Sequence, residues 1–142
     1  MNITESIIKF DGYRVIKSNF EITNENLEDG TGIKITPTYS RSIKKISDKN
    51  YVLELGILIS PTDNNPNVPF KIEIIIEGIF NIGDSDSADE IMNVNATAIL
   101  FPYLRSTLSL FMTTMNINPI ILPVINLVKM FEETNNITEE ND

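Results

Sequence analysis

Two stretches decide the fold: YVLELGILI from Tyr51 to Ile59, and FKIEIIIEGIFNI from Phe70 to Ile82. In the first stretch every second residue is large and apolar. In the second, apolar residues alternate in the same way, and the charged residues fall on the positions between them. Alternation with a period of two predicts strands with one face buried and the other in water. The polar segment at residues 61–69 predicts a hairpin loop, so the pair predicts an antiparallel sheet.

A further strand is predicted near the N-terminus, where Ile7 to Ile22 reads IIKFDGYRVIKSNFEI. Gly12 interrupts its alternation, which predicts a β-bulge at that point. The turn-rich residues 24–32 follow, with the sequence NENLEDGTG. The stretch from Ile33 to Ile46 has scattered apolar residues and one proline, and we interpret it as an extended crossover segment.

In the last third of the chain the pattern becomes helical. Ser87 to Glu90 reads SADE, which fits the capping box that opens many helices. A second helical segment is predicted to begin near Pro102, because proline is tolerated in the first turn of a helix. Apolar residues at three- and four-residue spacing form one stripe along this segment. They are Tyr103, Leu104, Leu108, Phe111, Met112 and Met115.

A short amphipathic helix is predicted from Val124 to Glu133, with Leu127, Met130 and Phe131 on one face at three- and four-residue spacing. Strands first and helices last favour an α+β fold, with a four-stranded antiparallel sheet followed by two C-terminal helices. Residues 1–133 are expected to form a single domain. Residues 134–142 are expected to be an acidic flexible tail.

Charge and composition exclude several classes of function. The 142 residues carry a formal net charge of −9, which argues against a nucleic-acid partner. Cysteine and histidine are absent, which removes thiolate and imidazole metal ligands and the commonest general base. The acidic residues from Gly83 to Glu90 depart from a calcium loop, because Ala88 and Asn95 occupy ligand positions. We therefore expect no enzyme, no metal and no cofactor.

The sequence also argues against a membrane or secreted protein. No secretory signal opens the chain. The most apolar stretch, Ile117 to Val128, is broken by asparagines and prolines and is shorter than the roughly 20 apolar residues of a spanning helix. We expect a cytoplasmic protein without direct membrane insertion.

Three strings in the C-terminal half carry a family resemblance. Glu77–Ile82 reads EGIFNI, Ala98–Arg105 reads AILFPYLR, and Pro123–Leu127 reads PVINL. In this order they resemble the SecB protein-export chaperones, in which a Gly-Ile-Phe strand end precedes a helix with Leu-Phe-Pro-Tyr-x-Arg. The resemblance is close over Phe70 to Phe131. In the N-terminal half it extends only to the order of the elements.

The resemblance implies an ATP-independent holdase chaperone that assembles as a dimer of dimers, a homotetramer. Its clients would be unfolded polypeptides, either preproteins for export or the antitoxin of a toxin–antitoxin pair. The polypeptide-binding groove would be lined by Tyr39, Ile43, Ile121, Leu122, Leu127, Met130 and Phe131. The dimers would meet through Leu104, Leu108 and Phe111.

Two further inferences concern partners. Glu73 matches one of the acidic residues through which export-type members dock the translocase motor ATPase, whereas Asn19 is an amide where the family has another acid. The alternative function is an adaptor or assembly protein that binds one specific folded partner through its apolar C-terminal helix. Promiscuity separates the two, because a holdase binds many unrelated unfolded chains.

Overall fold

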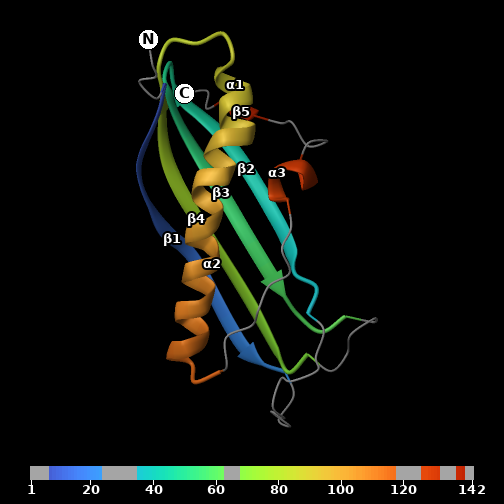
Figure 1. Cartoon of the computed structure of the whole chain (residues 1–142). Helices are drawn as coiled ribbons and strands as arrows, with labels where there is room; N and C mark the ends of the chain where they lie inside the picture. The colour runs from blue at the N-terminus through green and yellow to red at the C-terminus, as the bar shows by residue number, and fades with distance from the viewer. Residues whose placement is uncertain (1–6, 24–34, 63–67, 118–125, 132–136, 140–142) are drawn as a thin grey trace.

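A computed structural model describes residues 7–23, 35–62, 68–117, 126–131 and 137–139 of the chain. Four long strands come first and one long helical segment follows them (Figure 1), which gives the predicted α+β fold. In chain order the elements are β1 (Ile8–Ile22), β2 (Thr38–Ser47), β3 (Asn50–Ile59), β4 (Phe70–Ile82), α1 (Ala88–Ile91), the π-helical turn η1 (Met92–Ala96), α2 (Thr97–Thr114), α3 (Leu127–Met130) and β5 (Ile137–Glu139).

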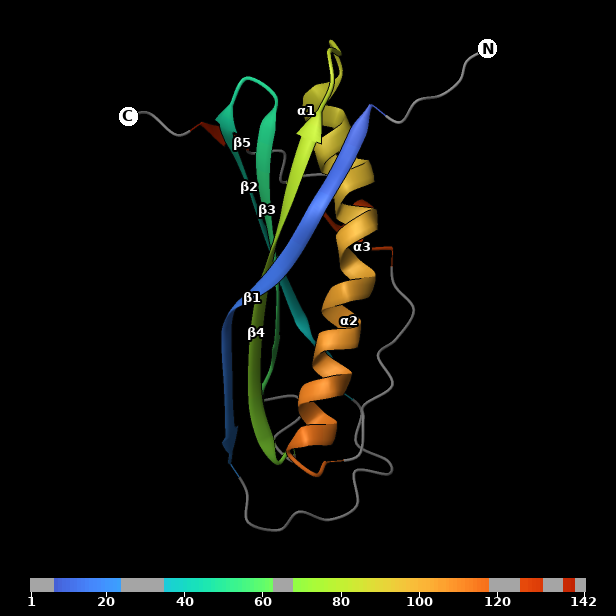
Figure 2. The same ribbon diagram turned by 90° about the vertical axis from the view of Figure 1, so that its left-hand side faces the viewer.

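The described strands form one sheet in the order β1-β4-β3-β2-β5. The four long strands pair antiparallel, which confirms the predicted four-stranded antiparallel sheet. The short β5 is added parallel to β2. The long helix lies along one face of the sheet, and the opposite face carries none of the described helices (Figure 1 and Figure 2).

The hydrophobic core lies between the helix and the sheet. Alternate residues of β3 and β4 are buried on the helix side, as their period of two predicts. They are Tyr51, Leu53, Leu55, Ile57, Ile59, Phe70, Ile72, Ile74 and Ile76. From α2, Leu100, Leu104, Leu108 and Met112 close the core. Each such side chain contributes about 1.5–3 kcal/mol to stability when it leaves water.

The β-bulge predicted at Gly12 is confirmed. The register between β1 and β4 shifts between Phe10 and Tyr13, and Gly12 has a φ of 106°. Residues with a side chain adopt this conformation only at a cost, so glycine is the residue that suits the position. A second register shift lies between Val15 and Lys17. Figure 2 shows that β1 bends partway along its length.

The interpretation of residues 33–46 as a crossover segment is wrong for most of its length. Thr38–Ser47 is a full strand, β2, and it pairs antiparallel with β3 through a turn at Asp48 and Lys49. The long antiparallel edge of β3 stabilises this strand, although its own sequence, TYSRSIKKIS, lacks strict alternation. Such tertiary pairing overrides weak local patterns.

A single continuous helical segment runs from Ala88 to Thr114, through α1, η1 and α2. It begins after Ser87, as predicted. The predicted capping box does not form, since Ser87 makes no side-chain cap and its backbone N–H donates to the Ser85 hydroxyl at 3.0 Å. None of the described helices is both long and apolar enough to cross a membrane.

The predicted helix start near Pro102 is wrong, because Pro102 lies inside α2. A proline there leaves the carbonyl four residues earlier without its helical partner. That carbonyl belongs to Ala98, and both Ala98 and Pro102 are exposed, so water can take the place of the missing donor. The rest of the helix is held by the packing of its apolar face.

The C-terminal segment contains two short elements. Within the described residues 126–131, the helix predicted from Val124 to Glu133 is the single turn α3, and the ends of the predicted range lie outside the described residues. The Asn126 side chain accepts a hydrogen bond from the Lys129 N–H at 3.0 Å, a typical N-cap. Of the predicted tail, the structure describes only residues 137–139, which form β5 with Ile137 as the partner of Ile43.

Candidate functional site

A groove of about 760 Å³ lies beside the long helix, between the start of that helix and strand β2. Arg41 and Lys45 come from β2 and Tyr51 from β3. The first turns of the helical segment contribute the opposite wall, and Phe131, directly after α3, contributes one end. Figure 1 shows α3 standing next to β2 on the helix side of the sheet. The groove is therefore built from elements that are far apart in the sequence.

Arg41 joins three elements at this groove. Its Nη1 donates to the Asn93 carbonyl at 2.8 Å and to the Thr97 hydroxyl at 3.1 Å. Its Nη2 donates to the Asn93 side-chain oxygen at 3.1 Å and to the Phe131 carbonyl at 3.2 Å. The guanidinium carbon also lies 4.7 Å from the centre of the Phe131 ring. Strand β2, the π-helical turn and the end of α3 are thus held together by one side chain.

The half-buried position of Arg41 has an electrostatic consequence. Burial lowers the pKa of its guanidinium below the ordinary value of 12.5. Arginine nevertheless stays charged at neutral pH, because its pKa starts so far above 7. The four hydrogen bonds and the aromatic ring replace part of the lost hydration.

A second cluster surrounds Tyr39, which precedes Arg41 by two residues on β2. Tyr39 packs edge-to-face on Phe101 of α2, with ring centres 5.7 Å apart. Arg105 stands 5.9 Å from the same Phe101 ring. The Tyr39 hydroxyl is buried and has no hydrogen-bond partner within the described part of the molecule. Burial raises the pKa of Tyr39, while the nearby charge of Arg105 acts in the opposite direction.

The structure separates the predicted groove residues into three groups. Ile43, Leu127 and Phe131 belong to the core and are 2%, 4% and 7% exposed. Tyr39 is half-buried, and Met130 is 50% exposed. Leu127 and Met130 therefore do not form one buried face, because Met130 is exposed although it follows Leu127 at a three-residue spacing. Ile121 and Leu122 lie outside the described residues.

Sequence reasoning missed Arg41, Asn93 and Phe101. Phe101 belongs to the Leu-Phe-Pro-Tyr string of the long helix, so a signal for it was present. Arg41 and Asn93 are ordinary polar residues, and only the packing of β2 against the helix brings them together. The groove also exposes Val94, which the helical stripe did not include.

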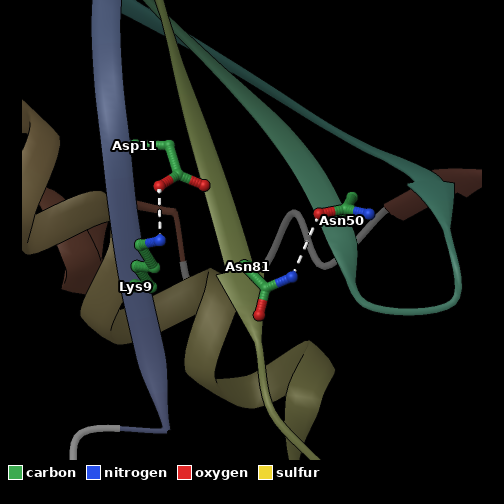
Figure 3. A network of polar contacts seen from close by, with 4 residues as sticks. All are labelled: Lys9, Asp11, Asn50 and Asn81. Carbon is green, nitrogen blue, oxygen red and sulfur yellow. Dashed lines mark hydrogen bonds and ion pairs between the residues drawn. The ribbon is translucent and has the colours of Figure 1, made fainter.

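The open face of the sheet carries ion pairs as well as half-buried apolar residues such as Leu58 and Ile75. Lys17 pairs with Glu73 at 2.7 Å, and Arg14 pairs with Glu77. Figure 3 shows two more contacts at the end of this sheet: Lys9 pairs with Asp11 at 3.5 Å, and the Asn81 amide donates to Asn50 at 3.1 Å. Glu73, the predicted docking residue, thus already has a cationic neighbour within its own chain.

The predicted oligomer residues also have defined places. Leu104 and Leu108 face the sheet and are fully covered by it, and Phe111 is half-buried. The side of α2 that remains open carries Leu110, which is 66% exposed. Tyr103 is exposed too and packs on Tyr13 of β1, with ring centres 4.7 Å apart.

Comparison with known proteins gives consistent matches. The family model described as preprotein translocase subunit SecB matches residues 21–137. An uncharacterized protein of Methanocaldococcus jannaschii is 28% identical, over 94% of this chain and 88% of its own. The protein-export protein SecB of Orientia tsutsugamushi strain Ikeda is 25% identical, over 95% of this chain and 79% of its own.

A solved structure shares the fold. It is a SecB-like chaperone of Mycobacterium tuberculosis in complex with a peptide from an antitoxin, and it matches with a TM-score of 0.65. The match covers 83% of this chain and 90% of that chain at 10% identity, so it shows the fold alone. Since the family model spans well over half of the 142 residues and the four-stranded sheet with its long helix agrees with it, this chain belongs to the SecB family.

Proposed function

We propose that this protein is an ATP-independent holdase chaperone that binds unfolded polypeptides beside α3. Membership of the SecB family carries the proposal. The groove between β2, the helix start and Phe131 is the binding surface that fits it, because it is large and has both apolar and charged walls. Binding before translocation takes place in the cytoplasm, and this is the location that we propose.

The client would touch the open parts of this surface. Val94 lines the groove and is exposed, and the exposed Met130 precedes the groove residue Phe131 in the chain. Outside the groove, Tyr39 and Phe101 are half-buried along β2 and α2. Exposed apolar side chains with polar neighbours suit the capture of unfolded segments by a chaperone that stays in solution. The buried residues Ile43, Leu127 and Phe131 would support this surface from below.

The test is the suppression of aggregation of several unrelated denatured proteins without any nucleotide. A holdase lowers the aggregation of most of them, because it binds unfolded chains and shifts their equilibrium by mass action. Protection of a single protein, with no effect on the others, would favour the adaptor alternative instead. The choice between preproteins and an antitoxin as the natural client follows from which proteins co-purify with the chain from its cells. The antitoxin option is supported by the peptide bound to the Mycobacterium tuberculosis chaperone.

The proposed assembly is a homotetramer, a dimer of dimers. Strand β1 lies at one edge of the sheet and exposes Tyr13, Val15 and Ile16, which gives an apolar edge suited to a neighbouring protomer. The open side of α2 gives a second surface, centred on Leu110. Four chains of 16.0 kDa make 4 × 16.0 = 64 kDa, the mass that light scattering should report.

Docking onto a translocase motor ATPase is a separate proposal that would use Glu73. Its carboxylate pairs with Lys17 at 2.7 Å, so a motor would have to share or replace this lysine. Binding of the purified motor ATPase, compared between the natural chain and Glu73→Gln, tests this part. Equal binding would remove Glu73 from the docking surface.

A further inference from the structure

The short strand β5 lies on the outer edge of β2 and brings the C-terminal tail back to the groove. Ile43, Lys44 and Lys45 of β2 pair in parallel with Ile137, Thr138 and Glu139. Both views of the chain place β5 directly beside β2, near the start of the long helix (Figure 1 and Figure 2). Arg41 and Lys45, which flank Ile43 on β2, line the groove. The edge that β5 covers therefore forms the margin of the proposed client site.

The pairing is small compared with an ordinary strand. It spans three residues, whereas strands in globular proteins commonly have about 5–6. A short strand at a sheet edge gains few ladder hydrogen bonds, and each of them contributes about 0.5–1.5 kcal/mol net. Another extended segment can therefore replace β5 without disturbing the four-stranded core.

The charge of β2 indicates which segments suit this edge. In a protein of net charge −9, β2 carries Arg41, Lys44 and Lys45 and has no acidic residue. The tail that supplies β5, residues 132–142, has five acidic residues and no basic one. Its Glu139 is the partner of Lys45 in the ladder. The acidic residues that line the groove, Asp86, Asp89 and Glu90, come from the opposite wall, so the basic character belongs to the β2 side.

We propose that the outer edge of β2 is a strand-docking site for clients, and that β5 occupies it in the free protein. The segment that fits is extended, pairs an apolar residue with Ile43 and has a carboxylate two positions later as the partner of Lys45, as the Ile-Thr-Glu sequence of β5 does. Backbone ladder hydrogen bonds give such a site affinity for many sequences, which is what a general holdase requires. The proposal rests on the proposed holdase function and adds the chemistry of the preferred client segment.

Competition between β5 and a client for the edge of β2 should raise the apparent dissociation constant of the client. When only a fraction of the molecules has the edge open, the apparent dissociation constant of a client is raised by the inverse of that fraction. A strand of this length leaves the edge open for a substantial fraction of the time. Fixing β5 in place should therefore weaken client binding by about tenfold or more, which is an easily measured change.

A reversible lock tests the competition. Lys44 and Thr138 are ladder partners, and parallel strands lie about 4.8 Å apart, within the range that a disulfide spans. Because the chain has no cysteine, Lys44→Cys with Thr138→Cys allows a single disulfide within one chain. Thr138→Cys alone, treated with the same oxidant, is the matched control. Circular dichroism of the oxidised and reduced forms checks that both are folded.

The probes are two synthetic 15-residue peptides with the same isoleucines, one with glutamates and one with lysines between them, each carrying a fluorophore. We expect the glutamate peptide to bind the natural chain at least about threefold more tightly than the lysine peptide, as one carboxylate–lysine contact allows. Oxidation of the double variant should abolish most of this binding, and reduction should restore it.

The outcomes separate this proposal from the holdase function. Unchanged peptide binding after oxidation, or tighter binding of the lysine peptide, would overturn the strand-docking site while aggregation assays still support a holdase. A disulfide that links two chains on non-reducing electrophoresis would mean that β5 covers the edge of a second copy, and would overturn the intrachain arrangement. A chain that protects no denatured protein at all would remove the holdase function itself.

Discussion

The Arg41 side chain on β2 makes two contacts with Phe131 at the end of α3. Its Nη2 donates to the Phe131 carbonyl at 3.2 Å, and its guanidinium carbon lies 4.7 Å from the centre of the Phe131 ring. The two residues are 90 positions apart in the sequence. The same guanidinium bonds Asn93 in the π-helical turn, so the position of α3 beside the groove depends on one contact network.

Replacing Arg41 with Met should lower the free energy of unfolding by about 2 kcal/mol, because hydrogen bonds to charged groups contribute about 1.5–3 kcal/mol and the apolar stem is kept. Urea unfolding followed by circular dichroism measures the change. Arg14→Met is the matched control, since Arg14 makes an exposed ion pair with Glu77 that should contribute less than about 1 kcal/mol. Equal losses of unfolding free energy in the two variants would show that the Arg41 network stabilises the fold no more than an exposed ion pair does.

The hydroxyl of Tyr39 gives a prediction of the opposite sign. It is buried and has no hydrogen-bond partner among the described residues, and an unpaired buried polar group costs about 1–3 kcal/mol. Tyr39→Phe should therefore raise the free energy of unfolding by about 1 kcal/mol at neutral pH. A loss of stability would mean that the hydroxyl has a partner in solution.

The same substitution should change the dependence of stability on pH. Burial raises the pKa of Tyr39 above its ordinary value of 10.0, so above pH 10 the unfolded chain loses this proton before the folded chain does. The unfolded state then binds fewer protons, and stability falls as the pH rises towards the raised pKa. Comparing unfolding at pH 9 and pH 11 should show a smaller fall in Tyr39→Phe than in the natural chain.

Assembly is tested on the open side of α2. Leu110 is 66% exposed, whereas Leu104 and Leu108 lie in the core, so a charge at position 110 can disturb a neighbour without disturbing the fold. Leu110→Glu should reduce the mass in light scattering from 64 kDa, four times 16.0 kDa, to that of a smaller species. Ser109→Glu, on the same exposed turn, should leave the mass unchanged. A tetramer that tolerates glutamate at position 110 would place the interface elsewhere.

The sequence predicts the parts of this fold that rest on local periodicity. β3 and β4 follow from alternation, and the bulge in β1 follows from Gly12, whose φ of 106° suits glycine. β2 has no strict alternation and forms because β3 offers it an edge, so no local pattern reveals it. Pro102 suggests a helix start, yet the packing of α2 on the sheet keeps the helix continuous through it.

The candidate site follows less directly from the sequence, because it is made by contacts between distant segments. Spacing correctly directs attention to α3 but puts Leu127, Met130 and Phe131 on one face, and the single turn of α3 buries only two of the three. The pairing of Arg41 with Asn93 and the return of β5 to β2 depend on tertiary packing. A pattern of single residues along the chain carries no information about either contact.

The last prediction separates the floor of the groove from its open rim, and it uses two residues that are adjacent in the sequence. Phe131 is 7% exposed and packs in the core, so Phe131→Ala should lower the free energy of unfolding by about 3–5 kcal/mol. Met130 is 50% exposed, so Met130→Ala should change it by less than about 1 kcal/mol. Urea unfolding gives both values.

Client binding should show the reverse order. Met130 is exposed and precedes the groove residue Phe131 in the chain, and the loss of its long apolar side chain should weaken the binding of an unfolded client several-fold at unchanged stability. Phe131→Ala should weaken client binding less than Met130→Ala does, because it acts only through the displacement of α3. Its client binding is measured below the unfolding transition and expressed per folded molecule. If Met130→Ala binds clients as well as the natural chain does, the rim of α3 is not part of the binding surface, and the client contacts must lie along Tyr39 and Phe101 instead.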